Sequence, residues 1–87
     1  MNVDWTKRAR RDLSRIVDWA PKSAARIYLE VECLAKSPFP GAHRRLRAWP
    51  KDHARGVPPY IILYRVQKGY LVVTGIKDTR RHREPFY

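Results

Sequence analysis

The segment SPFPG, residues 37–41, divides the chain into two halves with different hydrophobic periods. Its two prolines and its glycine cannot continue a helix. Before it, apolar residues recur at helical spacing, and after it they run together or alternate as they do in strands. A chain of 87 residues can bury a single core, so we predict one domain over residues 1–87 that combines helices with strands.

The first half predicts two helices, over about residues 7–19 and 22–36. Thr6 is expected to cap the first helix, and Pro21 favours the start of the second. The predicted apolar faces are Ala9, Leu13, Ile16, Val17 and Ala20 on the first helix and Ala24, Ile27, Tyr28, Val31, Leu34 and Ala35 on the second. Because the connection is short, the helices should form an antiparallel hairpin.

Four further segments indicate strands: NVDW (2–5), HRRLRAWP (43–50), YIILYRV (60–66) and YLVVTGI (70–76). The third is almost entirely apolar and is typical of a central strand, and QKG is expected to turn the chain into the fourth. The predicted fold class is therefore α+β, with an N-terminal strand and a helix hairpin packed on a largely antiparallel sheet of three to four strands. The last strand should continue into the first residues of KDTRRHREPFY (77–87).

The net charge of +11 is the strongest bulk feature, and thirteen of the nineteen basic residues are arginine. Five of the cations, Lys7, Arg8, Arg10, Arg11 and Arg15, form one face of the first helix, where they oppose the helix dipole without an evident benefit to stability. Self-repulsion on this scale favours a partner of opposite sign, either nucleic acid or an acidic protein. A solvated basic surface is the third alternative.

The composition disfavours disulfide-bonded, metal-binding, membrane-spanning and secreted proteins. A single cysteine and no zinc-type set of cysteine and histidine predict no disulfide, no metal and no cofactor. We expect no membrane span and no secretory signal, hence a cytoplasmic protein. Structural roles are predicted for Cys33 as a buried or half-buried residue, for Trp5, Trp19 and Trp49 as packing anchors, for Tyr60 and Tyr64 in the sheet, and for His43 and His53 in loops.

Four segments in order resemble the RelE/ParE superfamily of bacterial type II toxins: VDWTKRARRDLSRI, AARIYLEVECLAKSPFPG, PPYIILYRV and LVVTGIKDTRRHREPFY. Together they cover nearly the whole chain. The resemblance implies two helices against a curved sheet, and a growth-inhibiting toxin that a cognate antitoxin neutralises with an acidic or amphipathic segment. RelE-like members cut mRNA in the ribosome, whereas ParE-like members poison DNA gyrase.

The resemblance to RelE-like nucleases implies a set of candidate catalytic residues. Metal-free RNA cleavage needs a base, an acid and cations around the phosphorane. Arg81 and Tyr87 match the C-terminal arginine and tyrosine of these nucleases, and His82 is a further candidate. Partner or phosphate binding is predicted for Arg45, Arg47, Lys51 and Arg55 on the concave face of the sheet and for Arg65, Arg80 and Arg83 together at its rim.

One position departs from the RelE-like pattern. These nucleases usually carry an arginine directly after the tyrosine that begins the central strand, and this chain has Ile61 there. Arg65 lies about 13 Å further along a strand and cannot occupy that place, so Arg47 or Arg55 would have to compensate. We therefore favour a ParE-like toxin that poisons gyrase. The alternatives are a RelE-like ribosome-dependent mRNA endonuclease and a non-toxic basic module that binds nucleic acid.

Overall fold

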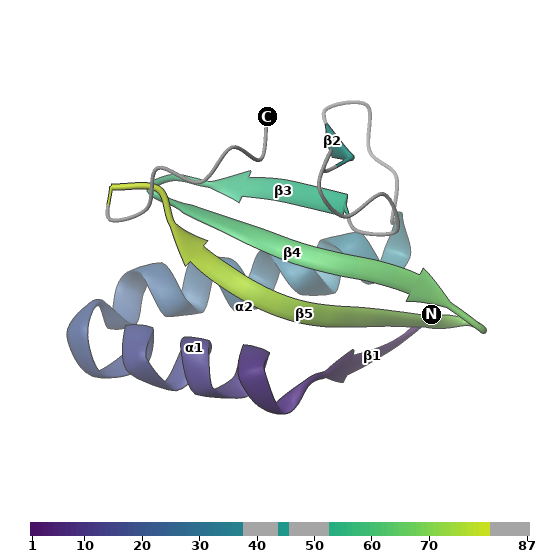
Figure 1. Ribbon diagram of the computed structural model, residues 1–87, viewed down its shortest axis with the longest axis horizontal. Helices are drawn as coiled ribbons and strands as arrows, with labels where there is room; N and C mark the ends of the chain where they lie inside the picture. Colours follow the sequence, from purple (N-terminus) through teal and green to yellow (C-terminus); the bar gives the residue numbers. More distant parts are fainter. Residues whose placement is uncertain (38–43, 46–52, 81–87) are drawn as a thin grey trace.

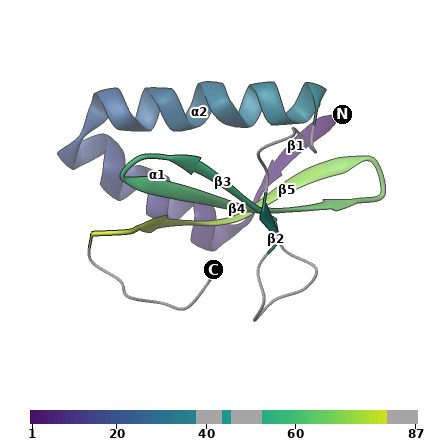
Figure 2. The same cartoon turned by 90° about the horizontal axis from the view of Figure 1, so that it is seen from above.

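The computed structural model describes residues 1–37, 44–45 and 53–80. Its elements in chain order are β1 (Asn2–Trp5), α1 (Lys7–Trp19), α2 (Pro21–Lys36), β2 (Arg44–Arg45), β3 (His53–Val57), β4 (Tyr60–Gln67) and β5 (Tyr70–Asp78). Helix α2 covers one face of the sheet, while α1 packs on α2 and runs beside β5 (Figure 1; Figure 2). No helix in these described ranges is long and apolar enough to cross a membrane.

The strands form one mixed sheet in the order β1-β5-β4-β3-β2. Strand β1 pairs with β5 in parallel, and the other three pairings are antiparallel. The sheet has one strand more than predicted, because HARGV at 53–57 is a strand. Its glycine and arginine give it a weak strand propensity, and pairing along β4 overrides that propensity. Of the strand predicted at 43–50, only β2 falls in the described residues.

The helix boundaries follow from local sequence signals. The Thr6 side chain accepts a hydrogen bond of 3.1 Å from the Ala9 N–H, which confirms it as the cap of α1. Ala20 closes α1 by donating its N–H to the Ile16 carbonyl, and Pro21 opens α2 immediately afterwards. With a single residue between them, the two helices form the predicted antiparallel hairpin (Figure 1).

The main hydrophobic core lies between the helices and the sheet. The helices contribute Ala9, Ile16, Ala24, Ile27, Val31 and Leu34, and the strands contribute Val57, Tyr60, Ile62, Tyr64, Leu71, Val73 and Ile76. Most of these residues belong to the predicted apolar faces and central strands. The core therefore fixes which side of each strand faces the helices.

Four side chains predicted to be buried or to anchor the core are instead exposed. Val17 and Tyr28 are each 50% exposed, because each helix buries only a narrow stripe. Tyr28 stacks on Trp5 at the margin of the core, with ring centroids 6.5 Å apart. Trp19, at 69% exposed, is not a packing anchor, and Cys33 lies on the outer side of α2.

The β4–β5 hairpin turns at Lys68 and Gly69, as predicted. Both residues have positive φ, 48° and 82°, which is the backbone of a two-residue type I′ turn. The returning strand extends through Lys77 and Asp78, so the first residues of the C-terminal basic segment complete β5. The register shifts between Leu63 and Tyr64, where β5 contributes one extra residue.

Candidate functional site

The sheet face that points away from the helices is apolar at its described centre. Along β4, Tyr60, Ile62 and Tyr64 belong to the core, so Ile61, Leu63 and Arg65 alternate to the opposite face. Ile61 and Leu63 form a separate cluster with Ala54 of β3, and all three are at most 7% exposed. We call Ala54, Ile61 and Leu63 the apolar patch.

Arg55 does not lie on this face. The β3 register pairs Arg55 with Ile62, a core residue, and therefore turns its side chain toward the helices. Its Nε donates a hydrogen bond of 2.7 Å to Oε1 of Glu30 on α2, and both side chains are about three-quarters buried. Of the two residues that would have to compensate for Ile61, Arg55 does not do so, because the two side chains are on opposite sides of the sheet.

Tyr64 lies beside this ion pair and is fully buried. Burial raises the pKa of its hydroxyl, and Arg55 and Glu30 act on that pKa in opposite directions. His53 packs against the Tyr64 ring at 5.4 Å between centroids and is only 6% exposed. His53 is therefore a buried strand residue and not the loop residue that we predicted.

Arg80 is held at the far end of the sheet from Arg65. Its Nε and Nη2 donate to the two carboxylate oxygens of Asp78 at 3.2 and 3.1 Å, and its guanidinium lies 5.9 Å from the centre of the Tyr60 ring. The hydrogen bond and charge of Asp78 raise the pKa of Arg80. Because β4 runs from Tyr60 to Arg65 between them, the predicted grouping of Arg80 with Arg65 is wrong.

Several predicted residues lie outside the part of the chain that the structure describes. These are Arg47, Lys51, Arg81, His82, Arg83 and Tyr87. Arg45 is placed in β2, but its side chain is not described. Their roles in catalysis or in phosphate binding stay predictions.

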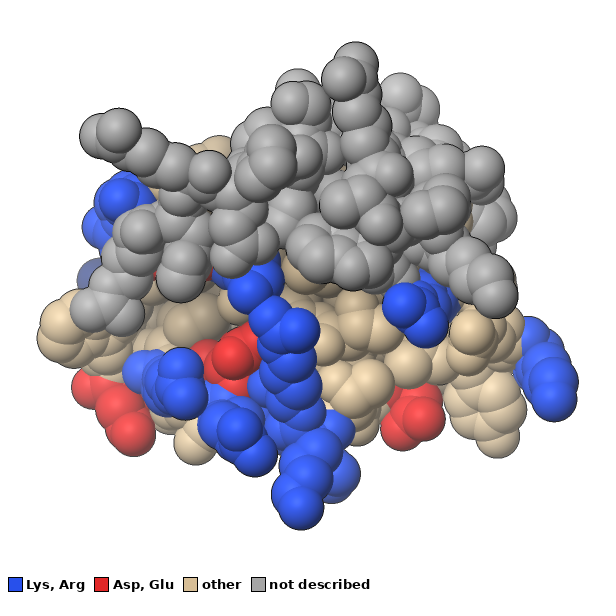
Figure 3. All heavy atoms as spheres, in the orientation of Figure 1, with Lys and Arg blue, Asp and Glu red and all other residues tan. Residues whose placement is uncertain are grey.

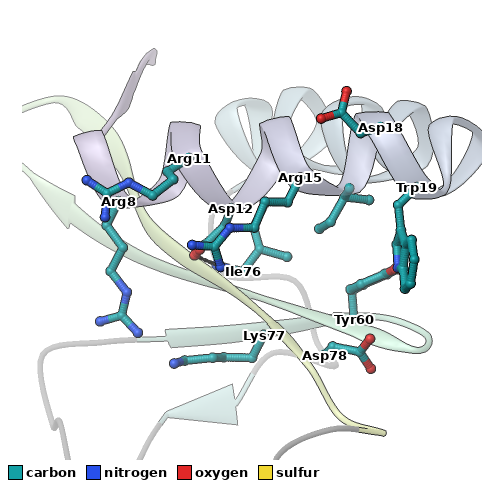
Figure 4. A pocket seen from close by; sticks show the side chains of 11 residues that line it. Arg8, Arg11, Asp12, Arg15, Asp18, Trp19, Tyr60, Ile76, Lys77 and Asp78 are labelled. Carbon is teal, nitrogen blue, oxygen red and sulfur yellow. Dashed lines mark hydrogen bonds between the residues drawn. The ribbon is translucent and has the colours of Figure 1, made fainter.

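A groove that the sequence did not reveal lies between α1 and the end of β5, with a volume of about 630 Å³. Helix α1 lines it with Arg8, Arg11, Asp12, Arg15, Ile16, Asp18 and Trp19, and the sheet lines it with Tyr60, Ile76, Lys77 and Asp78 (Figure 4). Basic side chains gather over α1 and β5 with acidic ones among them (Figure 3). We call this feature the α1–β5 groove.

The groove exists because β1 is short. Strand β1 pairs only with Tyr70–Val73, so within the described residues the rest of β5 has no strand on that side. Helix α1 takes the place of the missing strand, and Oδ2 of Asp12 accepts a hydrogen bond of 3.1 Å from the Ile76 N–H. The helical spacing of Arg8, Arg11 and Arg15 was visible in the sequence, but the position of β5 beside them was not.

The described residues contain no group of three or more histidine, cysteine, aspartate or glutamate side chains that could hold a metal ion. The features that they do contain are an apolar patch on one face of the sheet and a charged groove at its β5 edge. The charged groove is suited to binding another macromolecule, whereas the apolar patch is buried.

This arrangement of a helix hairpin on a mixed sheet is shared with solved structures of bacterial toxins. The chain is similar to the YoeB/ParE toxin from Agrobacterium tumefaciens, with a TM-score of 0.78, 18% identity and coverage of 90% of this chain and 98% of that one. It is also similar to a chain of the toxin–antitoxin complex RelBE2 from Mycobacterium tuberculosis, with a TM-score of 0.75, 22% identity and coverage of 88% and 95%. The predicted RelE/ParE-like fold is thereby confirmed.

A third similar structure is the chromosomal ParDE toxin–antitoxin system from P. aeruginosa, with a TM-score of 0.68, 20% identity and coverage of 90% and 95%. A search of curated proteins gives no significant match. Residues 3–85 match the family of the ParE toxin of the type II toxin–antitoxin system parDE. The chain belongs to this family and is a toxin of the type II class.

Proposed function

We propose that this protein is a ParE-like toxin that inhibits growth by poisoning DNA gyrase in the cytoplasm. The apolar patch is the observation that supports this choice over RNA cleavage. Membership of a toxin family leaves no reason to retain the third alternative, a non-toxic module that binds nucleic acid. The two remaining candidates differ in their target, which is either gyrase or mRNA.

The apolar patch occupies the place where a RelE-like nuclease carries a cation. Stabilising the phosphorane requires positive charge within hydrogen-bonding distance of its oxygens. Ile61 is 7% exposed and packs with Ala54 and Leu63, so it supplies no charge. Arg55 of β3 is bound to Glu30 on the other side of the sheet, and the described cation paired with Ile61 is Lys77, which belongs to the neighbouring strand β5. A protein target needs no such phosphate clamp.

A supercoiling assay tests this proposal. Purified gyrase, relaxed plasmid and ATP are incubated with increasing amounts of the toxin, and the topoisomers are separated on agarose. We expect supercoiling to be inhibited and cleaved plasmid to accumulate. Normal supercoiling at a saturating excess of folded toxin contradicts the choice of gyrase.

RNA cleavage is the second candidate, and the position of Arg65 favours it. Arg65 lies on the same face of the sheet as the apolar patch. A translating extract with a defined mRNA tests this candidate by primer extension. Cleavage that disappears with Arg81→Ala or Tyr87→Phe supports the nuclease, and an intact mRNA removes it.

A cognate antitoxin is the partner that both candidates share. The similar structures include the YoeB–YefM complex from Staphylococcus aureus as well as RelBE2 and ParDE, each of which is a toxin–antitoxin assembly. A net charge of +11 favours an acidic or amphipathic partner segment. We expect the product of the adjacent reading frame to co-purify with the tagged toxin and to restore growth. Purification of the toxin alone from the intact operon would refute this partner.

A further inference from the structure

The three arginines of the α1–β5 groove are not explained by the stability of the fold. Arg8, Arg11 and Arg15 all line the groove, and none of them forms an ion pair with another described residue. The first turn of α1 contains no acidic residue to offset them. Cations near the N-terminus of a helix oppose its dipole. Their placement along one groove therefore indicates a ligand.

The two ends of the groove differ in chemistry. Arg8, Arg11 and Lys77 gather at one end, and Trp19 stands against Tyr60 at the other (Figure 4). Trp19 has a side chain that is 69% exposed. A large aromatic ring held at the rim of a groove beside arginines has the composition of a protein-binding hot spot.

The walls between these ends are apolar and acidic as well as basic. Ile16 and Ile76 both line the groove, with Ile76 near its middle, and Asp18 and Asp78 lie toward the Trp19 end. A phosphate backbone that followed the groove would pass both carboxylates and an apolar surface. A protein segment with carboxylates at one end and an apolar side chain at the other meets each part with matching chemistry.

The spacing of the arginines also suits a helical partner. Along α1, Arg11 and Arg15 lie about 4.5 and 10.5 Å from Arg8. Acidic residues at the same intervals on a helix lying beside α1 would face them in turn. The volume of about 630 Å³ accommodates several side chains rather than a single ion.

We propose that the α1–β5 groove is the docking site of an acidic amphipathic segment of the cognate antitoxin. Carboxylates of this segment bind Arg8, Arg11 and Arg15, and an apolar side chain packs on Trp19. Binding neutralises three charges that no described residue pairs. The inference rests on the proposed antitoxin partner, but it does not depend on whether the toxin acts on gyrase or on mRNA.

Two triple variants of equal charge test the docking site. The groove variant is Arg8→Gln/Arg11→Gln/Arg15→Gln, and the control variant is Arg10→Gln/Lys22→Gln/Arg26→Gln, whose residues are exposed and do not line the groove. Each lowers the formal net charge from +11 to +8. Affinity for the purified cognate antitoxin is measured by calorimetry, and circular dichroism confirms that each variant is folded.

We expect the groove variant to bind the antitoxin about 100-fold more weakly and the control variant less than about fivefold more weakly. Trp19→Ala, an exposed change that leaves the core intact, should weaken binding about tenfold and serves if the groove variant fails to fold. Equal losses in the two triple variants, or an unchanged Trp19→Ala, overturn the docking site.

Two other outcomes separate the inference from its premises. If wild-type toxin binds no antitoxin, the proposed partner fails and the docking site fails with it. If the groove variant keeps its affinity for the antitoxin but loses affinity for a single-stranded DNA oligonucleotide, the groove takes nucleic acid and the proposed segment is wrong.

Discussion

Asp12→Ala should destabilise the protein, although it introduces a better helix former into α1. Oδ2 of Asp12 accepts the Ile76 N–H at 3.1 Å, on the edge of β5 that faces α1 and that β1 does not reach. Ile76 is 6% exposed, so the alanine variant leaves a buried donor without a partner. A lost hydrogen bond of this kind costs about 2 kcal/mol, and the higher helix propensity of alanine returns about 0.6 kcal/mol. The expected net loss is about 1.4 kcal/mol.

Asp18→Ala is the matched control for this prediction. Asp18 lies in the last turn of the same helix, is exposed, and accepts no hydrogen bond within the described ranges. Its replacement should give the same gain in helix propensity, together with relief of an unfavourable charge near the C-terminus of α1. The difference between the two variants is therefore expected to be at least about 2 kcal/mol, which is the Asp12 hydrogen bond plus the charge relief at Asp18.

Urea denaturation followed by circular dichroism measures both variants. For a domain of this size, the expected loss in Asp12→Ala corresponds to a fall in Tm of about 8 °C. Asp12→Asn keeps an oxygen acceptor and should lose about half as much. Amide exchange adds a local readout, because the Ile76 N–H should lose protection while those of β4 keep theirs. If Asp12→Ala is as stable as Asp18→Ala, α1 does not take the place of a strand beside β5.

Three further predictions concern stability. A double-mutant cycle of Arg55→Met and Glu30→Gln should show a coupling of about 1 kcal/mol in urea denaturation, since this pair is largely shielded from water; additive effects would refute it. Burial raises the pKa of Tyr64, so the native state keeps a proton that the unfolded state loses above pH about 10, and stability falls there. Tyr64→Phe should flatten that fall, whereas the exposed Tyr70→Phe should leave it unchanged. Lys68→Asn should raise stability by about 0.5 kcal/mol, because asparagine tolerates the positive φ at this turn; an unchanged unfolding midpoint would contradict it.

The sequence predicted the elements whose signals are local. A threonine cap, a proline at the start of a helix and apolar residues at helical spacing determine α1 and α2 almost to the residue. The β4–β5 hairpin followed from two apolar runs around a short turn. Strand β3 was missed because its residues have little preference for a strand until β4 lies beside them.

The positions of the candidate site residues were predicted less well, for a physical reason. Whether Arg55 faces the helices or the opposite side depends on the register of β3 with β4, and a shift of one residue would reverse it. The place of Arg80 depends on where β5 ends relative to Tyr60. Both are properties of pairings between segments and cannot be obtained from the composition of either segment. That position 61 carries isoleucine and not a cation is visible in the sequence, because this fact does not depend on how the strands pair.

The first residues of the C-terminal basic segment have structural roles that the sequence alone did not indicate. Lys77 and Asp78 are strand residues that line the α1–β5 groove, and Arg80 folds back on Asp78. Lys77 pairs with Ile61 across β4 and β5, so its side chain lies on the same face of the sheet as the apolar patch. A partner that docks in the groove would therefore lie beside the apolar patch.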